Sequence, residues 1–488
     1  MKNTFGSSLT MWYTINMEKL YEIKLDRNSE LPLYRQLAER ILELRNSGEL
    51  PIGTRLPPIR KLAAHVGVNK LTVVNTYKHL EKRKAIYSHV GSGTYITEEA
   101  VFAEYNDGGQ SEAYHKFDMD TAINFIQSMD NADLFPVKAF RDAFNHVMDR
   151  DLGTVFSRSE PWGDKALREE VCKDLRRQDI CADISEIQIV STLGCGVEAL
   201  SSRMLSEGDA IIIERPTFQD YAAPIWYRKA LIYKVDMQED GMDLEQLEDQ
   251  LKTLKPKFIF IVSRFQIPTC YSYSLSKKQR LLELASKYDT YILEIDNSGE
   301  FVYGDEAKKD VKSLKALDTE GRVVFYKSYS KEIMPGLSIA VLVHSSKTKG
   351  LCRGSFGLTA PHPFVQRTFT QMLSSGDYYK HVANVKKTFE SRYKTMIRAI
   401  DKNLSRYVEY KNPQGGLSLW LKLKDNKVWT NELLSGLMRR NVLVQAGSVY
   451  YPDTGYEETS YFSLSIAGVN ETQIEEGIRE IAQCLKFH

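Results

Sequence analysis

Short, mostly apolar runs separated by helical stretches recur along this 488-residue chain from Ile123 onward. Five of these runs are residues 187–190, 210–213, 258–262, 290–293 and 323–326. The stretches between them have helical character and include residues 197–205, 244–254 and 276–288. Apolar strands that alternate with helices are typical of a mainly parallel sheet covered on both faces. The pattern therefore predicts an α/β fold whose ligands bind at the carboxyl ends of the strands.

The length of the chain exceeds what one hydrophobic core supports, so two or three domains are expected. A formal net charge of +1 excludes a generally basic nucleic-acid coat protein, although opposite charges in separate domains can cancel. Six cysteines without a CxxC pair favour reduced thiols in a cytoplasmic protein, with neither disulfides nor a metal site. No apolar run reaches the roughly 18 residues of a membrane helix, so no membrane partner is expected.

The N-terminal part has the pattern of a winged helix-turn-helix. Residues 31–46 carry apolar side chains at helical spacing, and residues 58–66 form a second helical stretch that Gly67 closes. Asn69 is a good N-cap for a third helix. A strand pair around residues 85–96 follows, with a glycine-containing tip. Short helices joined by a tight turn and followed by a strand pair predict a winged helix-turn-helix.

Basic side chains are concentrated in this part of the chain. Residues 50–95 contain eight lysines and arginines against one acid, Glu81, a local charge of +7 by subtraction. Such an excess favours binding to DNA phosphates. The alternative is a solvated basic face on a winged helix that binds protein.

Four motifs in this part resemble a GntR-type DNA-binding domain. They are Leu33-Tyr34-Arg35-Gln36-Leu37, residues 53–63, residues 68–73 and Gly91-Ser92-Gly93-Thr94-Tyr95. The DNA-binding residues that this resemblance implies are Arg60, Asn69, Lys70, Thr72 and, at the wing tip near the minor groove, Gly91. The family usually has Ser-Arg where this chain has Asn69-Lys70. Because lysine lacks the bidentate fork that reads guanine, we expect weaker or altered base readout there.

A lysine behind two serines follows the apolar run at residues 323–326, in the stretch Ser328-Tyr329-Ser330-Lys331. An amine in such a loop suits imine formation with an aldehyde cofactor, while the hydroxyls hold the cofactor's phosphate. The alternative is a surface lysine in a serine-rich turn.

The loops that follow the predicted strands resemble those of the type I aminotransferase fold. The segments that carry this resemblance are residues 134–136, Gly163, Leu167-Arg168, residues 208–210, 214–218, 266–269, 328–336 and 376–381, and Ala467-Gly468. A GntR-like domain joined to such a domain is similar to the MocR family of bacterial transcription regulators, over roughly residues 30–486. The resemblance implies a type I aminotransferase-like domain with a mainly parallel central sheet and a smaller C-terminal α+β part.

The resemblance also implies a cofactor and partners. Lys331 matches the lysine that binds pyridoxal 5'-phosphate, Ser328 and Ser330 match hydroxyls near its phosphate, and Phe218 lies where an aromatic flanks the ring. Gly196 lies in a loop where a helix N-terminus should cradle the phosphate. The implied partners are operator DNA, a small-molecule effector and a second copy of the chain in a head-to-tail homodimer.

Several positions depart from the family. Four of them are Ser338 in place of a phosphate-binding arginine, Ile295 in place of the aspartate that protonates the pyridine nitrogen, Asn297 in place of a tyrosine, and Ser463 in place of an arginine for the substrate carboxylate. A fifth is Asp220, where a relative that senses γ-aminobutyrate has an arginine. Asp296 can replace the missing aspartate only if the backbone shifts by one residue, because successive side chains of a strand point to opposite faces. Lys327 or Arg264 could supply the missing positive charge.

These departures decide between the possible functions. A charge-assisted bond from arginine contributes about 1.5 to 3 kcal/mol, and loss of the pyridine acid weakens the electron sink of transamination. We therefore expect a cytoplasmic DNA-binding regulator that senses a small ligand through pyridoxal phosphate on Lys331, with no catalytic residues. The alternatives are a pyridoxal-phosphate-dependent aminotransferase with a vestigial DNA-binding domain, and a regulator without cofactor whose pocket senses another ligand or only dimerises.

The expected domain boundaries follow from these motifs. They are a disordered extension at residues 1–17, the winged helix-turn-helix at 18–97, a polar, acidic linker at 98–120, and the aminotransferase-like domain at 121–488, with a large part at about 135–355 and a small part at about 356–488.

Overall fold

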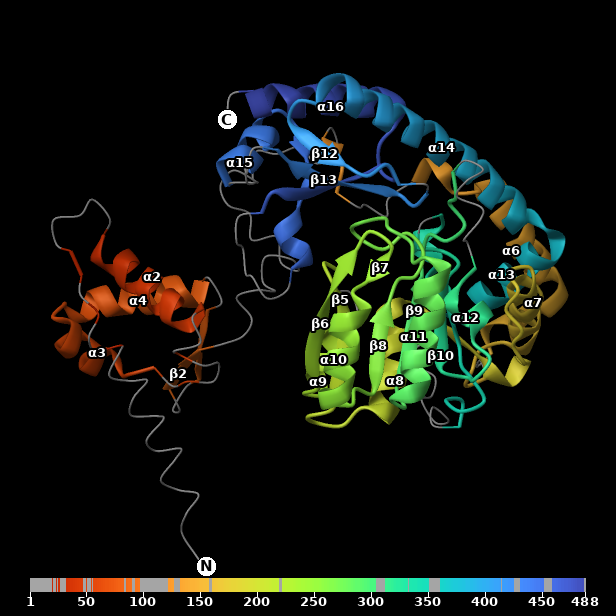
Figure 1. Ribbon diagram of the computed structural model, residues 1–488, viewed down its shortest axis with the longest axis horizontal. Coiled ribbons are helices and arrows are strands. Elements are labelled where there is room, and N and C mark those ends of the chain that lie inside the picture. Colours follow the sequence, from red (N-terminus) through yellow and green to blue (C-terminus); the bar gives the residue numbers. More distant parts are fainter. Residues whose placement is uncertain are drawn as a thin grey trace, which may run out of the picture. The chain divides into compact units, whose positions relative to one another are not determined.

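A computed structural model shows two compact units, Met1–Lys116 and Phe117–His488, called the head and the body below (Figure 1). The described residues are 20, 23, 25–26, 32–46, 50, 54, 56–82, 85–89, 93–96, 122–126, 132–157, 160–218, 222–303, 312–331, 333–350, 360–413, 415–424, 431–451 and 459–486. The predicted extension at 1–17, the predicted linker at 98–120, Gly91 and Asp220 lie outside them. The division between the units falls within the range predicted for the linker.

The head contains three helices and a strand pair. They are α2 (Leu33–Asn46), α3 (Ile59–Val66), α4 (Lys70–Lys82), and the antiparallel strands β1 (Ile86–His89) and β2 (Gly93–Ile96). Gly67 ends α3 with a φ of 69°, a left-handed conformation that glycine adopts without strain. Leu37, Leu62, Val73 and Leu80 are fully buried and join the three helices in one core. The predicted winged helix-turn-helix elements are therefore present.

The body is built on an eight-stranded sheet in the order β4–β11–β10–β9–β8–β5–β6–β7. The strands are β4 (Ile187–Val190), β5 (Ala210–Arg215), β6 (Leu231–Gln238), β7 (Gly241–Met242), β8 (Phe258–Ile261), β9 (Tyr291–Asp296), β10 (Val323–Ser328) and β11 (Ala340–Val343). The five central strands, β6, β5, β8, β9 and β10, run parallel. β11 is antiparallel to both of its neighbours, and β7 is antiparallel to β6.

Helices cover both faces of this sheet, as the continuous apolar strands require. Ile211 and Ile213 pack on the face of α8 (Leu193–Met204) and α9 (Ala222–Tyr227). Ile212 packs on the opposite face with α10 (Leu244–Leu254) and α11 (Leu275–Lys287), which Figure 1 shows in front of the sheet. The remaining helices beside the sheet are α6 (Val137–Asp151), α7 (Lys165–Arg176), α12 (Leu314–Leu317) and α13 (Pro363–Ser375), with 3-10 turns at Ala132–Leu134, Leu152–Phe156, Ile184–Glu186 and Pro335–Leu337.

The small part of the body has an antiparallel sheet in the order β12–β13–β16–β15. Its elements are β12 (Val408–Tyr410), β13 (Ser418–Leu423), β15 (Gln445–Ala446), β16 (Tyr461–Ser465), α14 (Asp377–Asn403), α15 (Asn431–Arg439), α16 (Glu471–Lys486) and a 3-10 turn at Gly447–Tyr450. The short strands β3 (Ile123–Asn124) and β14 (Val442–Leu443) pair in parallel and bring the start of the body to this part. α13 packs against α6 and α7 in the large part, although the sequence boundary near residue 356 placed it in the small part.

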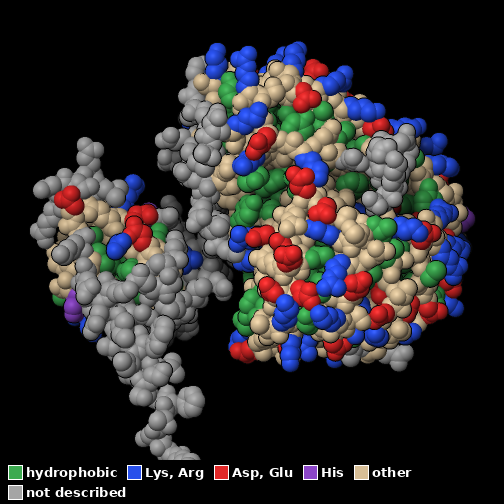
Figure 2. Space-filling view, in the orientation of Figure 1, with side chains coloured by type: hydrophobic (Ala, Val, Ile, Leu, Met, Phe, Trp, Pro, Cys, Tyr) green, Lys and Arg blue, Asp and Glu red, His purple; other side chains and the backbone are tan. Residues whose placement is uncertain are grey.

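The predicted α/β architecture is confirmed, including the mainly parallel sheet and the smaller C-terminal sheet. The helices among the described residues include none that is long and apolar enough to cross a membrane. On the face of the body shown in Figure 2, lysine and arginine side chains are interspersed with aspartate and glutamate.

Candidate functional site

Lys331 and Phe218 lie together at the carboxyl ends of two strands. Phe218 follows β5 and is buried, and Lys331 lies three residues beyond β10 and is half-buried. Lys331 Nζ is 5.4 Å from the centroid of the Phe218 ring, within the range of a cation–π contact. Ser328 Oγ accepts a hydrogen bond of 2.9 Å from the backbone N–H of Lys331 and so fixes the start of the loop. A hydroxyl that accepts one bond can still donate its proton to a ligand.

The hydroxyl of Ser330 has a structural role. Ser330 Oγ accepts a hydrogen bond of 2.8 Å from the N–H of Ile339 and donates one of 3.3 Å to the Ile339 carbonyl. Both bonds are buried, and the single proton of the hydroxyl is used. Ser330 therefore holds the Lys331 loop to the segment before β11, and its contact with a phosphate stays a prediction.

The predicted phosphate cradle at the start of α8 is closed at Gly196. Thr192 caps the helix: its side chain accepts a 3.2 Å bond from the Cys195 N–H, and its carbonyl accepts a 3.0 Å bond from the Gly196 N–H. A Cβ on Gly196 would lie 3.4 Å from Leu342 and 3.5 Å from Tyr326. These are ordinary van der Waals distances, so a side chain would fit at position 196, and the Gly196 N–H is used within the first turn of α8.

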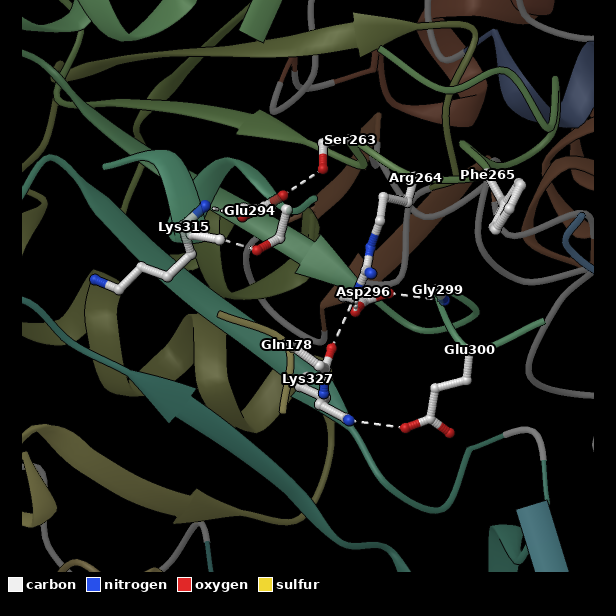
Figure 3. Close-up of polar contacts among 12 residues, drawn as sticks. Gln178, Ser263, Arg264, Phe265, Glu294, Asp296, Gly299, Glu300, Lys315 and Lys327 are labelled. Atoms are coloured by element: carbon white, nitrogen blue, oxygen red, sulfur yellow. Dashed lines mark hydrogen bonds and ion pairs between the residues drawn. The ribbon is translucent and has the colours of Figure 1, made fainter. Parts of the chain in front are cut away.

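The face of β9 toward α8 carries Ile295, which is buried in the same cluster as Phe218. The strand continues regularly through Asp296, which lies opposite Lys327 on β10, so the backbone does not shift by one residue. Asp296 instead forms a buried ion pair with Arg264, and its Oδ1 accepts a 2.9 Å bond from the Gly299 N–H (Figure 3). Asp296 is therefore not placed to contact a cofactor ring.

The two cations that the sequence offered for a phosphate are also bound elsewhere. Lys327 Nζ lies 3.0 Å from Asp174 Oδ2 on α7. It also lies 2.8 Å from Glu300 Oε1 (Figure 3). Burial alone would lower the pKa of Lys327, but Asp174 and Glu300 outweigh it and raise the pKa above its ordinary value. Tyr329 donates a 2.7 Å bond to the same Asp174 oxygen. Lys327 and Arg264 are thus paired within the fold, which corrects the expectation that either binds a phosphate.

Asn297, one residue beyond β9, is a polar residue that the sequence marked only as a departure. Its side chain is more than nine-tenths buried, and neither its Nδ2 nor its Oδ1 has a hydrogen-bond partner among the described residues. Asn297 directly follows Asp296, which lies opposite Lys327 on β10 in the last pair of the two strands. A buried amide without partners costs free energy, so a ligand that bonds to it would be stabilised.

The cluster around Phe218 includes residues of the small part. Trp420 of β13 and Tyr450 are buried in it, and the Thr217 N–H donates a 3.0 Å bond to the Tyr450 carbonyl. Ser463 is buried on β16, opposite Trp420. The candidate site therefore lies where the large and small parts of the body meet.

Glu214 is a buried carboxyl group that the sequence analysis did not single out as a functional residue. It ends the apolar part of β5 and accepts hydrogen bonds from the Tyr273 hydroxyl at 2.7 Å and the Val262 N–H at 3.1 Å. Burial raises its pKa to about 8, which these bonds only partly oppose. Gln266 donates to Glu214 at 3.3 Å and to the Pro216 carbonyl at 2.7 Å, so the carboxyl group supports the loop that leads to Phe218. The sequence does contain a signal for this residue, since Glu214 directly follows three isoleucines of a predicted strand.

The predicted DNA-binding residues of the head divide into two kinds. Arg60 and Lys70 are exposed at the starts of α3 and α4. Asn69 instead caps α4: its Oδ1 accepts a 2.7 Å bond from the Thr72 N–H and a 2.9 Å bond from the Thr72 hydroxyl. The side chains of Asn69 and Thr72 are thus bound to each other.

Known proteins are similar to this chain in both the head and the body. The family model described as "Bacterial regulatory proteins, gntR family" matches residues 33–96. The chain is 27% identical over 478 residues to the HTH-type transcriptional regulator TauR of Rhodobacter capsulatus, covering 93% of this chain and 96% of that protein. It is also 27% identical over 452 residues to the HTH-type transcriptional regulator YcxD of Bacillus subtilis, covering 91% and 98%.

The body alone resembles solved aminotransferases. A kynurenine aminotransferase from Pyrococcus horikoshii is 26% identical with a TM-score of 0.68, and the match covers 75% of this chain and 91% of that one. The chain is a GntR-type regulator with an aminotransferase-like body. The helix-turn-helix of the regulator implies DNA binding, and its body has the fold of pyridoxal-phosphate-dependent aminotransferases.

The residues around Lys331 fit such a cofactor in part. The regulator offers an amine over an aromatic ring, a serine hydroxyl at Ser328 and the buried amide of Asn297. These groups suit an aldehyde on a planar, hydrogen-bonding ring. Ile295 stands where the family has the acid that protonates the ring nitrogen. The site therefore suits binding of the ring, but it lacks the proton donor that strengthens electron withdrawal by the ring.

Proposed function

We propose that the regulator binds operator DNA through its head and senses a small molecule in its body through pyridoxal 5'-phosphate on Lys331. The observation that carries the proposal is the position of the Lys331 amine, 5.4 Å from the centroid of the Phe218 ring. When bound, pyridoxal phosphate supplies an aldehyde that combines reversibly with amines and a ring that withdraws electrons. Lys331 would hold the aldehyde carbon, Phe218 would stack on the ring, and Ser328 would donate a hydrogen bond.

The neighbours of Lys331 favour sensing over turnover. Ile295 cannot donate a proton to the ring nitrogen, and Asp296 is held by Arg264 on the other face of the sheet. A ligand that displaces the amine of Lys331 would therefore bind without efficient transfer of its amino group. Such a ligand can change DNA affinity only if it binds two arrangements of the protein differently.

We further propose that the regulator is a head-to-tail homodimer that works in the cytoplasm, where its DNA lies. Two heads in one dimer would contact two half-sites of an operator, which raises affinity over that of one head.

Absorbance tests the covalent link directly. The purified regulator is incubated with pyridoxal phosphate and scanned for the band of the lysine-bound cofactor, then reduced with borohydride and digested for mass spectrometry. We expect the band and a cofactor adduct on the peptide that contains Lys331. Lys331→Ala should lose both, whereas Lys347→Ala, which removes an exposed lysine of the same unit, should keep both.

Two results would contradict the proposal in different ways. A colourless protein without adduct after incubation would remove the cofactor and favour a regulator that senses another ligand. Steady release of a keto acid from common amino acids would show an enzyme instead of a sensor.

A further inference from the structure

One face of α4 carries exposed side chains that the core of the head does not use. Leu71, Asn75 and Lys78 are exposed and lie at positions i, i+4 and i+7, which form a single stripe on a helix. The core uses a different stripe of the same helix, on which Val73 and Leu80 are fully buried. The exposed stripe is therefore not required to hold α4 in place.

Leu71 is the unusual member of this stripe. Its side chain is 64% exposed, although it stands between Lys70 and Thr72 at the start of the helix. A single exposed leucine is ordinary on a protein surface. This one lies in the first turn of the helix that follows the helix-turn-helix turn, directly after the exposed cation Lys70, in a head whose α3 also exposes Arg60 and Lys61.

The other polar side chains of this first turn are already engaged. Asn69 Oδ1 accepts both the N–H and the hydroxyl of Thr72, so the Thr72 hydroxyl is spent inside the helix cap. Lys70 is exposed and, as a compact charge without a bidentate fork, suits a phosphate better than it suits base readout. Leu71 and Asn75 are therefore two exposed side chains of α4 that the cap does not engage and whose chemistry distinguishes between bases.

The chemistry of these two side chains selects base pairs. Leucine makes no hydrogen bond, and the one apolar group on the major-groove edge of DNA is the C5-methyl of thymine. Asparagine pairs bidentately with N6 and N7 of adenine. Four residues of helix separate the two side chains by about 6 Å along the axis, and a base-pair step is about 3.4 Å. The two contacts thus fall within about two base-pair steps.

We propose that α4 reads A·T base pairs in the major groove, with Leu71 on a thymine methyl and Asn75 on an adenine. This inference rests on the DNA binding of the proposed function and names the bases that the head selects.

Deoxyuridine isolates the methyl group, because it differs from thymidine only by that group. Sites are first selected from random duplexes with the full-length regulator, and each thymine of the selected site is then replaced singly by deoxyuridine. We expect one replacement in each half-site to weaken binding about fourfold, the contribution of one buried carbon group. With Leu71→Ala the thymine and deoxyuridine duplexes should bind equally.

Two further variants complete the experiment. Asn75→Ala should lower the preference for adenine over the other bases, at one position of the site, by about tenfold. Lys78→Ala, on the same stripe, should weaken both duplexes equally and leave the thymine-to-deoxyuridine ratio at that of the wild type. A circular dichroism melt equal to that of the wild type shows that each variant is folded.

The outcomes separate this inference from the function on which it rests. If the regulator selects no DNA, the proposed function and the inference both fail. If it selects a site but deoxyuridine has no effect on the wild type, or the same effect on Leu71→Ala, only the inference fails. A selected site without thymine in its half-sites would also overturn it.

Discussion

Burial raises the pKa of Glu214 to about 8, and its hydrogen-bond partners in the described part of the chain include no cation that would oppose this shift. Its partners are the hydroxyl of Tyr273, the amide of Gln266 and a backbone N–H, and none of them balances a negative charge. The folded-state pKa of about 8 stands well above the ordinary value of 4.5. The folded protein therefore keeps a proton that the unfolded chain releases between these two pH values.

This proton predicts how stability changes with pH. Since the folded state binds it more tightly, the free energy of unfolding falls as pH rises from 4.5 to about 8. Glu214→Gln keeps the shape and has no proton to lose. We expect the variant to gain stability relative to the wild type as pH rises from 5 to 8, by several kcal/mol at most, since each pKa unit corresponds to about 1.4 kcal/mol.

Urea unfolding of both proteins between about pH 5 and pH 9 measures this difference. Glu245→Gln, at an exposed position on α10, is the matched control and should show no such trend. A difference between Glu214→Gln and the wild type that stays constant across this range would show that Glu214 is charged in the folded protein.

Single residues of the candidate site could be predicted from sequence only where a local motif defined them. The motif order brought Lys331 and Phe218 to one site, and the structure places their side chains together. The roles of Ser330 and Lys327 could not be predicted, because each depends on a partner in another segment. Lys327, for example, pairs with Asp174, which is 153 residues away along the chain.

At the level of elements, the start of α4 depends on one side chain. Asn69 binds both the N–H and the hydroxyl of Thr72, so a substitution there acts on the helix as well as on any DNA contact. We expect Asn69→Ala to lower the stability of the head by about 1 kcal/mol. Because a frayed α4 presents its whole exposed stripe less well, DNA affinity should fall by a similar factor for every sequence.

Thermal melts and binding to matched and mismatched duplexes test this prediction. Asn69→Ser, which retains a capping hydroxyl, should keep most of the stability and affinity. A change in base preference with Asn69→Ala would instead assign Asn69 a direct contact with a base.

The strands of the body could be predicted well because continuous apolar runs follow from burial on both faces. The runs at 187–190 and 323–326 correspond to β4 and β10, and the helix predicted at 244–254 is α10. The face to which each strand residue points also followed from alternation, which placed Ile295 and Asp296 on opposite faces. The packing of α13 on α6 and α7 could not be predicted, since a periodic stripe does not name its partner.

At the level of the whole molecule, the proposed homodimer makes a measurable prediction. Light scattering behind size-exclusion chromatography should give twice the mass of one chain at micromolar concentrations, with and without pyridoxal phosphate. An effector should then change operator affinity by about 5- to 150-fold, the range of a coupling free energy of 1 to 3 kcal/mol. A monomer at every concentration would contradict the proposed homodimer. If operator affinity stays unchanged while a ligand is bound, the ligand binds the body but does not regulate DNA binding.

The cap of α4 has a consequence for how such regulators diverge. The Asn69–Thr72 pair builds the helix start, while the exposed stripe of Leu71 and Asn75 takes no part in it. Substitutions on the stripe therefore leave folding almost unaffected. If Leu71 and Asn75 read bases as proposed, a duplicated gene could change the bases that its product selects through these two codons, while the fold of the head, the body and the response to a ligand stay the same.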